Sequence, residues 1–298
     1  MRIRSLTGHF NSVELLTFAY ILITAACILT LFGIHTQTCT LLFYRIAFFT
    51  AVCLMAFISE KSGNKFVNYI RYLFPFSLIA YWYPETYYLA HPDNTGLPES
   101  IFLPNLDSFF EHLDVAIFGC SPAIEFSKAF PQSVVSEIMY FGYFSYYLLF
   151  LFTFTYFFFV KPDMADRAMF YCLCSFFIFY AIFTLVPVAG PQFYYSFPDS
   201  QVPDGYFFCS LMRWLQFEGE MPTGAFPSSH VGLTLIVMIL LFQNARKYFY
   251  IILPVAIILT AATVYIKAHY LVDVLAAFIA APLILALSKS LFRLTVSD

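Results

Sequence analysis

Long runs of apolar residues, separated by short polar breaks, dominate the pattern along the chain. A helix needs about 20 mostly apolar residues to cross the hydrocarbon core of a bilayer. Eight runs come near that length, and turn-forming and charged residues fill the breaks between them, as in 60–64 and 243–247. The pattern therefore predicts about eight transmembrane helices, at 14–33, 39–58, 70–90, 134–160, 167–187, 228–244, 248–266 and 270–288.

The third run is the least regular, because Arg71, Pro75 and Glu85 interrupt it. Two long polar segments, 91–133 and 188–227, stand out between the apolar runs. Within the first of them, residues 105–118 predict a short helix lying in the membrane interface.

Composition supports a membrane protein, since 61% of the residues are hydrophobic and 11% are charged, against roughly 25% charged in a soluble domain. Phe and Tyr are abundant (39 and 22) whereas Gly is scarce (11). That balance favours apolar helices with interfacial aromatic residues over a β-barrel. The predicted class is an all-α integral membrane protein. A net charge of -3 gives no basic surface for a nucleic acid, so no nucleic-acid partner is expected.

Orientation follows from the basic residues, because cytoplasmic loops retain Lys and Arg during membrane insertion. With the N-terminus inside, the cytoplasmic loops hold eleven of the fifteen basic residues: Arg2, Arg4, Lys61, Lys65, Arg71, Lys161, Arg167, Arg246, Lys247, Lys289 and Arg293. Both termini are therefore predicted to be cytoplasmic, and the two long loops extracytoplasmic, periplasmic or luminal. Cys120 and Cys209 fall in those outer loops, and the sequence leaves open whether they form a disulfide.

The first element with chemical potential is Pro227-Ser228-Ser229-His230, which opens directly into an apolar helix. Pro followed by Ser is a helix-start signal, and the free amide groups of a helix start bind phosphate. A histidine at that place can donate a proton to a leaving oxygen. The alternative is that Ser228 only caps the helix and His230 lies at a wet interface.

The second element is the segment 267–273, between the last two predicted helices. His269 and Asp273 are four residues apart at a helix start, so the carboxylate can fix the tautomer of the imidazole and raise its basicity. Such a pair activates a nucleophile or a base. The alternative is a local capping ion pair. Because the sixth and eighth predicted helices start on the same side of the membrane, we expect His230 and His269 to face one pocket.

The two elements resemble motifs of the type-2 phosphatidic acid phosphatase superfamily, which has a Ser-Gly-His at one helix start and later a His followed by an Asp four residues on. The resemblance covers about 134–288 and implies a six-helix membrane core with both motifs on its extracytoplasmic side. It divides the chain into N-terminal membrane helices with an interfacial loop (1–133) and a catalytic bundle (134–298). By this resemblance, His269 attacks phosphorus to form a phosphohistidine, Asp273 orients it and His230 protonates the leaving group. No metal or organic cofactor is implied.

The chain departs from the family pattern at its basic positions. Family phosphatases have an Arg six residues before the nucleophilic His, where this chain has Thr263, and a Lys followed by Arg-Pro upstream, where this chain has Gln192. Other groups must balance the phosphate charge. The expected substrate-binding residues are Lys267, Ser228, Ser229, Gly190, Gln192 and Arg213. For Lys267, an interfacial lysine that snorkels to water is an equal alternative.

The missing basic residues, with the string 269–273, look more like the lipid phosphotransferase branch, which includes inositol phosphorylceramide and sphingomyelin synthases. A phosphodiester carries one negative charge where a phosphomonoester carries nearly two, so fewer cations are needed. The expectation is an enzyme that transfers a phospho-head group from a membrane phospholipid to a lipid or polyol alcohol. The alternatives are a lipid phosphate or pyrophosphate phosphatase and, in a different class, a non-enzymatic protein that binds or translocates lipid.

Overall fold

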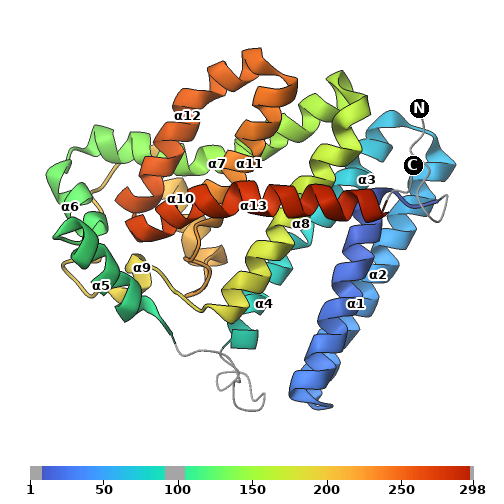
Figure 1. The fold of residues 1–298 in the computed structure, drawn as a ribbon, viewed down its shortest axis with the longest axis horizontal. Coiled ribbons are helices and arrows are strands. Elements are labelled where there is room, and N and C mark those ends of the chain that lie inside the picture. The colour runs from blue at the N-terminus through green and yellow to red at the C-terminus, as the bar shows by residue number, and fades with distance from the viewer. Residues whose placement is uncertain (1–8, 91–104, 296–298) are drawn as a thin grey trace. The chain divides into compact units, whose positions relative to one another are not determined.

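The computed structural model describes residues 9–90 and 105–295, and within those ranges it contains helices and turns but no strand. Figure 1 shows the helices along the chain. They are α1 (Ser12–Phe32), α2 (Thr36–Ser62), α3 (Lys65–Ser77), α4 (Ile79–Ala90), α5 (Asp107–Phe118), α6 (Pro122–Ala129), α7 (Ser133–Val160), α8 (Pro162–Leu185), α9 (Pro191–Tyr194), α10 (Phe207–Gly219), α11 (Ser229–Asn244), α12 (Arg246–Tyr265) and α13 (Leu271–Thr295). The all-α prediction is confirmed for these residues.

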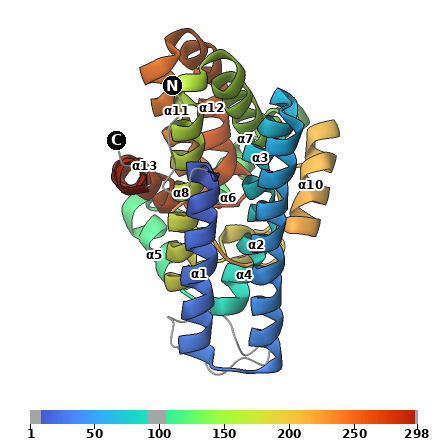
Figure 2. The same cartoon turned by 90° about the vertical axis from the view of Figure 1, so that its right-hand side faces the viewer.

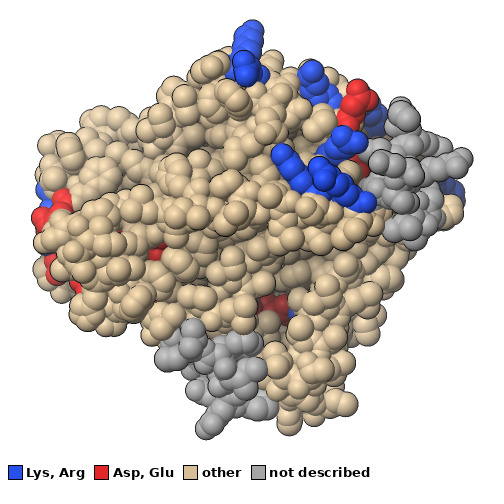
Figure 3. Space-filling view, viewed as in Figure 1, with Lys and Arg blue, Asp and Glu red and all other residues tan. Residues whose placement is uncertain are grey.

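Six of the described helices are long and apolar enough to cross a membrane: α1, α2, α7, α8, α12 and α13. Each overlaps one of the predicted spans. The predicted span 228–244 corresponds to α11, which is apolar but only 16 residues long. Figure 3 shows one face of the protein, on which uncharged residues make up most of the visible surface. The chain therefore has the fold of a multi-pass integral membrane protein.

The predicted span 70–90 is wrong as a single helix, because α3 ends at Ser77 and α4 begins at Ile79. Pro75 lies inside α3 and Pro84 lies inside α4. A proline lacks the N–H group that would bond the carbonyl one turn earlier, so the segment loses a hydrogen bond on each side of Leu78. The third apolar run therefore forms two short helices that meet at Leu78.

Contacts between Cα atoms divide the chain into two compact units. The first unit combines residues 1–101 with 154–177 and 286–298, and the second combines 102–153 with 178–285. The helices α7, α8 and α13 each contribute residues to both units. Every candidate site residue named above lies in the second unit.

Two buried ion pairs explain how charged side chains fit among the apolar helices of the first unit. Figures 1 and 2 show α1 and α2 running side by side. Arg71 Nε lies 2.6 Å from Glu14 Oε1, and an Arg45 guanidinium nitrogen lies 2.8 Å from Glu85 Oε2. A charge in an apolar surrounding is tolerated when an opposite charge pairs with it. The charges that interrupt the third apolar run are therefore neutralised by partners on α1 and α2.

Packing in the second unit brings separate loops together around the first turn of α13. Phe110 of α5 packs with Val188, Ala225, Tyr270 and Val272 in one buried apolar cluster. This cluster joins α5, the loop after α8, the loop before α11 and the turn before α13. The predicted short helix within 105–118 is present as α5.

The two cysteines of the predicted outer loops are both free thiols. Cys120 is exposed, whereas Cys209 is buried in a cluster with Tyr140 and Met212. The structure therefore contains no disulfide between Cys120 and Cys209.

Candidate functional site

The start of α11 is tied to the first turn of α13. Ser228 is the N-cap of α11, and its hydroxyl accepts a hydrogen bond from the Val231 N–H at 3.3 Å. The Ser228 N–H donates to the backbone carbonyl of Asp273 at 3.1 Å. An N-cap leaves the first amide groups of its helix pointing outward, where they can bind an anion. These bonds fix His230, the second residue of α11, beside the beginning of α13.

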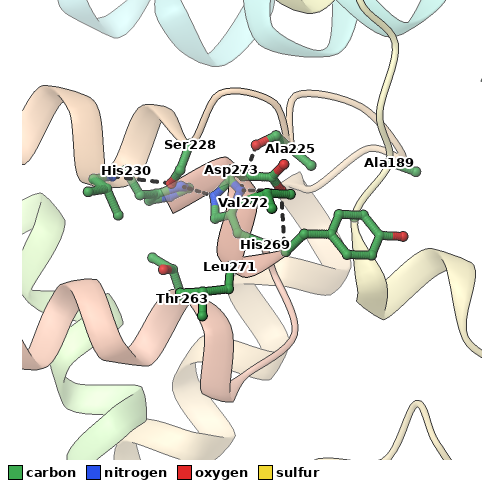
Figure 4. Close-up of polar contacts among 12 residues, drawn as sticks. Ala189, Ala225, Ser228, His230, Thr263, His269, Leu271, Val272 and Asp273 are labelled. Atoms are coloured by element: carbon green, nitrogen blue, oxygen red, sulfur yellow. Dashed lines mark hydrogen bonds and ion pairs between the residues drawn. The ribbon is translucent and has the colours of Figure 1, made fainter. Parts of the chain in front are cut away.

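The two histidines lie next to each other although 39 residues separate them in the sequence. Nε2 of His269 lies 3.4 Å from Nδ1 of His230, and the ring centroids are 5.6 Å apart. Figure 4 shows the two side chains directed toward one another from α11 and from the turn before α13. We call His230, His269 and Asp273, with Ser228 and Ala225, the histidine centre.

A backbone carbonyl determines the tautomer of His269. Nδ1 of His269 lies 2.8 Å from the carbonyl oxygen of Ala225 (Figure 4). Because a carbonyl oxygen only accepts hydrogen bonds, Nδ1 carries the proton. Nε2 of the neutral ring therefore presents its lone pair toward His230. The backbone N–H of His269 also donates to the Thr263 carbonyl at 3.0 Å, so Thr263 holds the histidine through its main chain.

Asp273 is fully buried and lies slightly farther from the imidazole than Ala225 does. Its Oδ2 is 3.7 Å from Nδ1 of His269 and accepts a hydrogen bond from the Tyr270 N–H at 2.9 Å. The other oxygen, Oδ1, has no hydrogen-bond partner among the described residues. This arrangement leaves one carboxylate oxygen available to stabilise positive charge that develops on the imidazole.

Burial keeps His269 neutral. Its side chain is 3% exposed, and this burial lowers the pKa of His269 to about 4. Removing a charged imidazolium from water is costly, which favours the neutral form. At neutral pH the ring is therefore an unprotonated base, the form that a nucleophile requires.

Aromatic residues of α7 enclose His230. The ring centroids of Tyr143 and Tyr146 each lie 4.6 Å from the centroid of the His230 ring. The Tyr143 hydroxyl donates to Oε1 of Glu220 at 3.0 Å. These contacts fix the plane of the His230 ring and bring a carboxylate close to the histidine centre.

A comparison with protein families gives evidence that is independent of this geometry. The sequence profile of the PAP2 superfamily matches residues 114–287, which is more than half of the chain. The chain belongs to the PAP2 superfamily. Comparisons with curated proteins and with solved structures gave no match. The PAP2 match begins within α5 and includes every residue of the histidine centre.

The basic residues expected to bind phosphate point elsewhere in this PAP2 protein. The Lys267 side chain is 1% exposed, and its ammonium donates to the Ser127 hydroxyl at 3.0 Å. Arg213 pairs with Asp204 at 2.6 Å. The pKa of Lys267 is lowered to about 8, mainly by burial and to a smaller extent by repulsion from the Lys128 ammonium. Neither cation bonds a residue of the histidine centre.

The other expected substrate-binding residues are divided between two places. Ser229 begins α11 beside His230. The Gly190 N–H is already bonded to the Asp107 carboxylate at 2.7 Å, so it is not free to bind phosphate. Gln192 bonds Glu220 through its amide nitrogen at 2.6 Å, and its backbone N–H donates to the Lys267 carbonyl at 2.8 Å.

Two carboxylates of α5, which are not among the residues predicted from the sequence, bond the loops around the site. Asp107 accepts hydrogen bonds from the backbone of Ala189 and Gly190 and, at 3.0 Å, from the Tyr270 hydroxyl. Asp114 accepts from the N–H groups of Leu271 and Val272, both at 2.9 Å. The available signal was their spacing, because Asp107, Phe110 and Asp114 recur on one face of a helix.

A metal site of the usual kind is not formed by the residues that the structure describes, which contain no group of three or more His, Cys, Asp or Glu side chains placed to hold an ion.

Proposed function

We propose that this PAP2 protein cleaves a lipid phosphate ester through a phosphohistidine and passes the phospho-head group to an alcohol, as inositol phosphorylceramide synthases do. The observation that carries the proposal is the pair of imidazoles 3.4 Å apart, with the proton of His269 held on Nδ1 by Ala225. An unprotonated Nε2 beside a second imidazole supplies a nucleophile and a proton donor at one place.

In the first step, Nε2 of His269 attacks phosphorus and gives up its contact with His230. The bond between phosphorus and the lipid oxygen breaks, and protonated His230 gives its proton to that oxygen. In the second step, the acceptor hydroxyl attacks phosphorus, its proton goes to His230, and the bond to Nε2 breaks. Asp273 stabilises the positive charge on His269 while the phosphoenzyme exists.

Transfer to an alcohol, rather than to water, is supported by the charge around the histidines. Thr263 and Gln192 stand where family phosphatases have basic residues, and Lys267 and Arg213 bond other partners. A phosphodiester, with one negative charge, suits such a site better than a phosphomonoester with nearly two. The helix-start amides at Ser229 and His230 supply the remaining anion-binding groups.

The test is turnover of a labelled phospholipid by the purified protein in the presence of candidate alcohols. The proposal predicts a new labelled phospholipid that His269→Ala abolishes while the variant still inserts into membranes. Release of free phosphate alone would instead identify a phosphatase. Full function in the His269→Ala variant would identify a non-enzymatic lipid-binding or translocating protein.

We also propose that the histidine centre faces the extracytoplasmic side and that both termini are cytoplasmic. The Lys and Arg residues of the sequence support this orientation, since eleven of the fifteen fall on the side of the termini. Labelling of Cys120, which is exposed, by a membrane-impermeant maleimide in intact cells tests it. Labelling only after the membrane is opened would reverse the orientation.

A further inference from the structure

The helix α10 has one buried face and one exposed aromatic face. Cys209 and Met212 are buried. Phe207, Trp214 and Phe217 are instead 67%, 58% and 85% exposed. Because an α-helix turns once in about 3.6 residues, the spacing of these three rings places them along one side of α10. An exposed apolar surface of this kind marks contact with a partner or with a membrane.

The buried face of α10 packs on two membrane-spanning helices near their ends. Cys209 and Met212 share one apolar cluster with Tyr140 of α7 and with Ala262 and Tyr265 of α12. Tyr265 is the last residue of α12, and Tyr140 lies about 10 Å along α7 from its first residue. The 28 residues of α7 make about 42 Å of helix, so α7 extends about 6 Å beyond each side of a hydrocarbon core about 30 Å thick. The helix α10 therefore lies where the hydrocarbon core meets the lipid head groups.

Glu137 of α7 holds the start of α10 at this level. Its Oε2 accepts a hydrogen bond from the Tyr206 N–H at 2.6 Å, and its Oε1 accepts from the Phe208 N–H at 2.7 Å. The first amide groups of a helix have no partner within that helix, and leaving them unpaired close to hydrocarbon is costly. The carboxylate satisfies these amide groups and fixes α10 to the first turns of α7.

The charges of α10 favour a zwitterionic lipid surface over an anionic one. Its one basic residue, Arg213, is paired with Asp204 at 2.6 Å. Its acidic residue, Glu218, is exposed in the last turn. An anionic leaflet attracts unpaired Lys and Arg side chains, which the described residues of α10 do not supply. Aromatic rings, in contrast, are typical of the interface of a bilayer whatever its charge.

We propose that α10 is an interfacial helix that inserts Phe207, Trp214 and Phe217 into a zwitterionic leaflet on the side of the histidine centre. The sequence pattern assigns 188–227 to a polar loop outside the membrane, whereas insertion makes part of this loop a membrane-bound segment. The insertion goes beyond the proposed function and does not depend on it, because the depth of α10 and its exposed rings support it without reference to a reaction.

An inserted α10 also connects the lipid surface to the histidine centre. Glu220 directly follows α10 as its C-cap residue. Oε1 of Glu220 accepts a hydrogen bond from the Tyr143 hydroxyl at 3.0 Å, and the Tyr143 ring packs on His230. The segment that the lipids hold is therefore the one that ends in contact with a residue packed on His230.

The fluorescence of Trp214 reports where α10 lies. The chain has two tryptophans, and Trp82 is fully buried, so the difference in emission between the unmodified protein and Trp214→Phe isolates Trp214. The full-length protein is reconstituted in phosphatidylcholine bilayers that contain lipids brominated near the head group or near the chain end. Trp214 should lose most of its emission to the shallow bromines, less to the deep bromines and little to aqueous iodide.

Phe217→Ser removes one inserted ring without removing buried packing, since Phe217 is exposed. It should weaken insertion, so that iodide quenches Trp214 more and the shallow bromines quench it less. Phe109→Ser is the matched control, because Phe109 is an exposed phenylalanine of another short helix, α5. It should leave both kinds of quenching unchanged. Equal quenching in Phe217→Ser and in the unmodified protein would contradict insertion of this face.

Iodide quenching without bromine quenching would place α10 in water and overturn the proposal. Shielding of Trp214 from both quenchers would overturn it too, because a protein surface, such as a second copy of this chain, would then cover the rings. Replacing part of the phosphatidylcholine with phosphatidylglycerol should leave the quenching unchanged, and stronger bromine quenching in the anionic bilayer would overturn the zwitterionic assignment. None of these measurements needs lipid turnover, so failure of the insertion is distinct from failure of the proposed function.

Discussion

The carbonyl oxygen of Ala225 lies 2.8 Å from Nδ1 of His269, closer than the carboxylate of Asp273 at 3.7 Å. The backbone of the loop before α11 thus performs the task that the sequence analysis gave to Asp273, which is to fix the tautomer. Asp273 is left with an electrostatic task, because its buried carboxyl group lies beside the imidazole without the hydrogen bond that fixes the tautomer. This division changes what a substitution at Asp273 should do.

Asp273→Asn should reduce kcat about 100-fold or more while leaving KM and thermal stability nearly unchanged. The amide can still accept the Tyr270 N–H bond, so the first turn of α13 is retained. The charge that stabilises the phosphohistidine is lost. Steady-state kinetics with unfolding followed by intrinsic fluorescence would measure both quantities.

Asp163→Asn is a matched control, since Asp163 is an exposed carboxylate in the first turn of α8. It should leave both kcat and stability unchanged. Unchanged kcat in Asp273→Asn would reduce Asp273 to a helix cap.

His230→Ala should trap the phosphoenzyme when the leaving group needs no proton. A lipid analogue with a p-nitrophenol leaving group can phosphorylate His269 without an acid, whereas attack by the acceptor still needs His230 as base. We expect a burst of p-nitrophenol followed by slow turnover, with an acid-labile label on the protein. Normal turnover in this variant would remove His230 from the mechanism.

His230, His269 and Asp273 could be selected from the sequence because their signals are local, whereas the carbonyl of Ala225 carries no such signal. Pro227 and Ser228 mark a helix start, and the spacing of His269 and Asp273 marks a shared face. The spacing of Asp107 and Asp114 marks one face of α5, but their bonds depend on how that face packs against loops more than 70 residues away, which the spacing does not report. The third run was recognised as irregular at Pro75 but was still predicted as one helix, since hydropathy does not register the hydrogen bonds that Pro75 and Pro84 remove.

Asp114→Asn should destabilise the start of α13. Asp114 accepts the N–H groups of Leu271 and Val272, and an amide can accept only one of them without turning its own N–H groups toward the other. We expect a loss of about 1–2 kcal/mol in unfolding free energy and a fall in kcat of about tenfold. Thermal unfolding and kinetics measure the two effects.

Asp114→Glu is the conservative partner in this test, because it restores the charge with a longer side chain. Partial recovery of kcat would show that the carboxylate positions the turn before α13. An Asp114→Asn protein with unchanged kcat and stability would contradict that role.

Acid should destabilise the protein through His269. Burial lowers the pKa of His269 to about 4 from its ordinary value of 6.5, so the unfolded chain binds a proton at a higher pH than the folded chain does. The stability contributed by the neutral ring is complete above pH 6.5 and is lost as the pH falls toward 4, by roughly 3 kcal/mol in all.

In His269→Gln this part of the pH dependence should disappear, whereas His112→Gln, at an exposed histidine, should retain it. A wild-type protein and a His269→Gln variant with parallel stability curves between about pH 7.5 and 4.5 would mean that His269 titrates equally in both states.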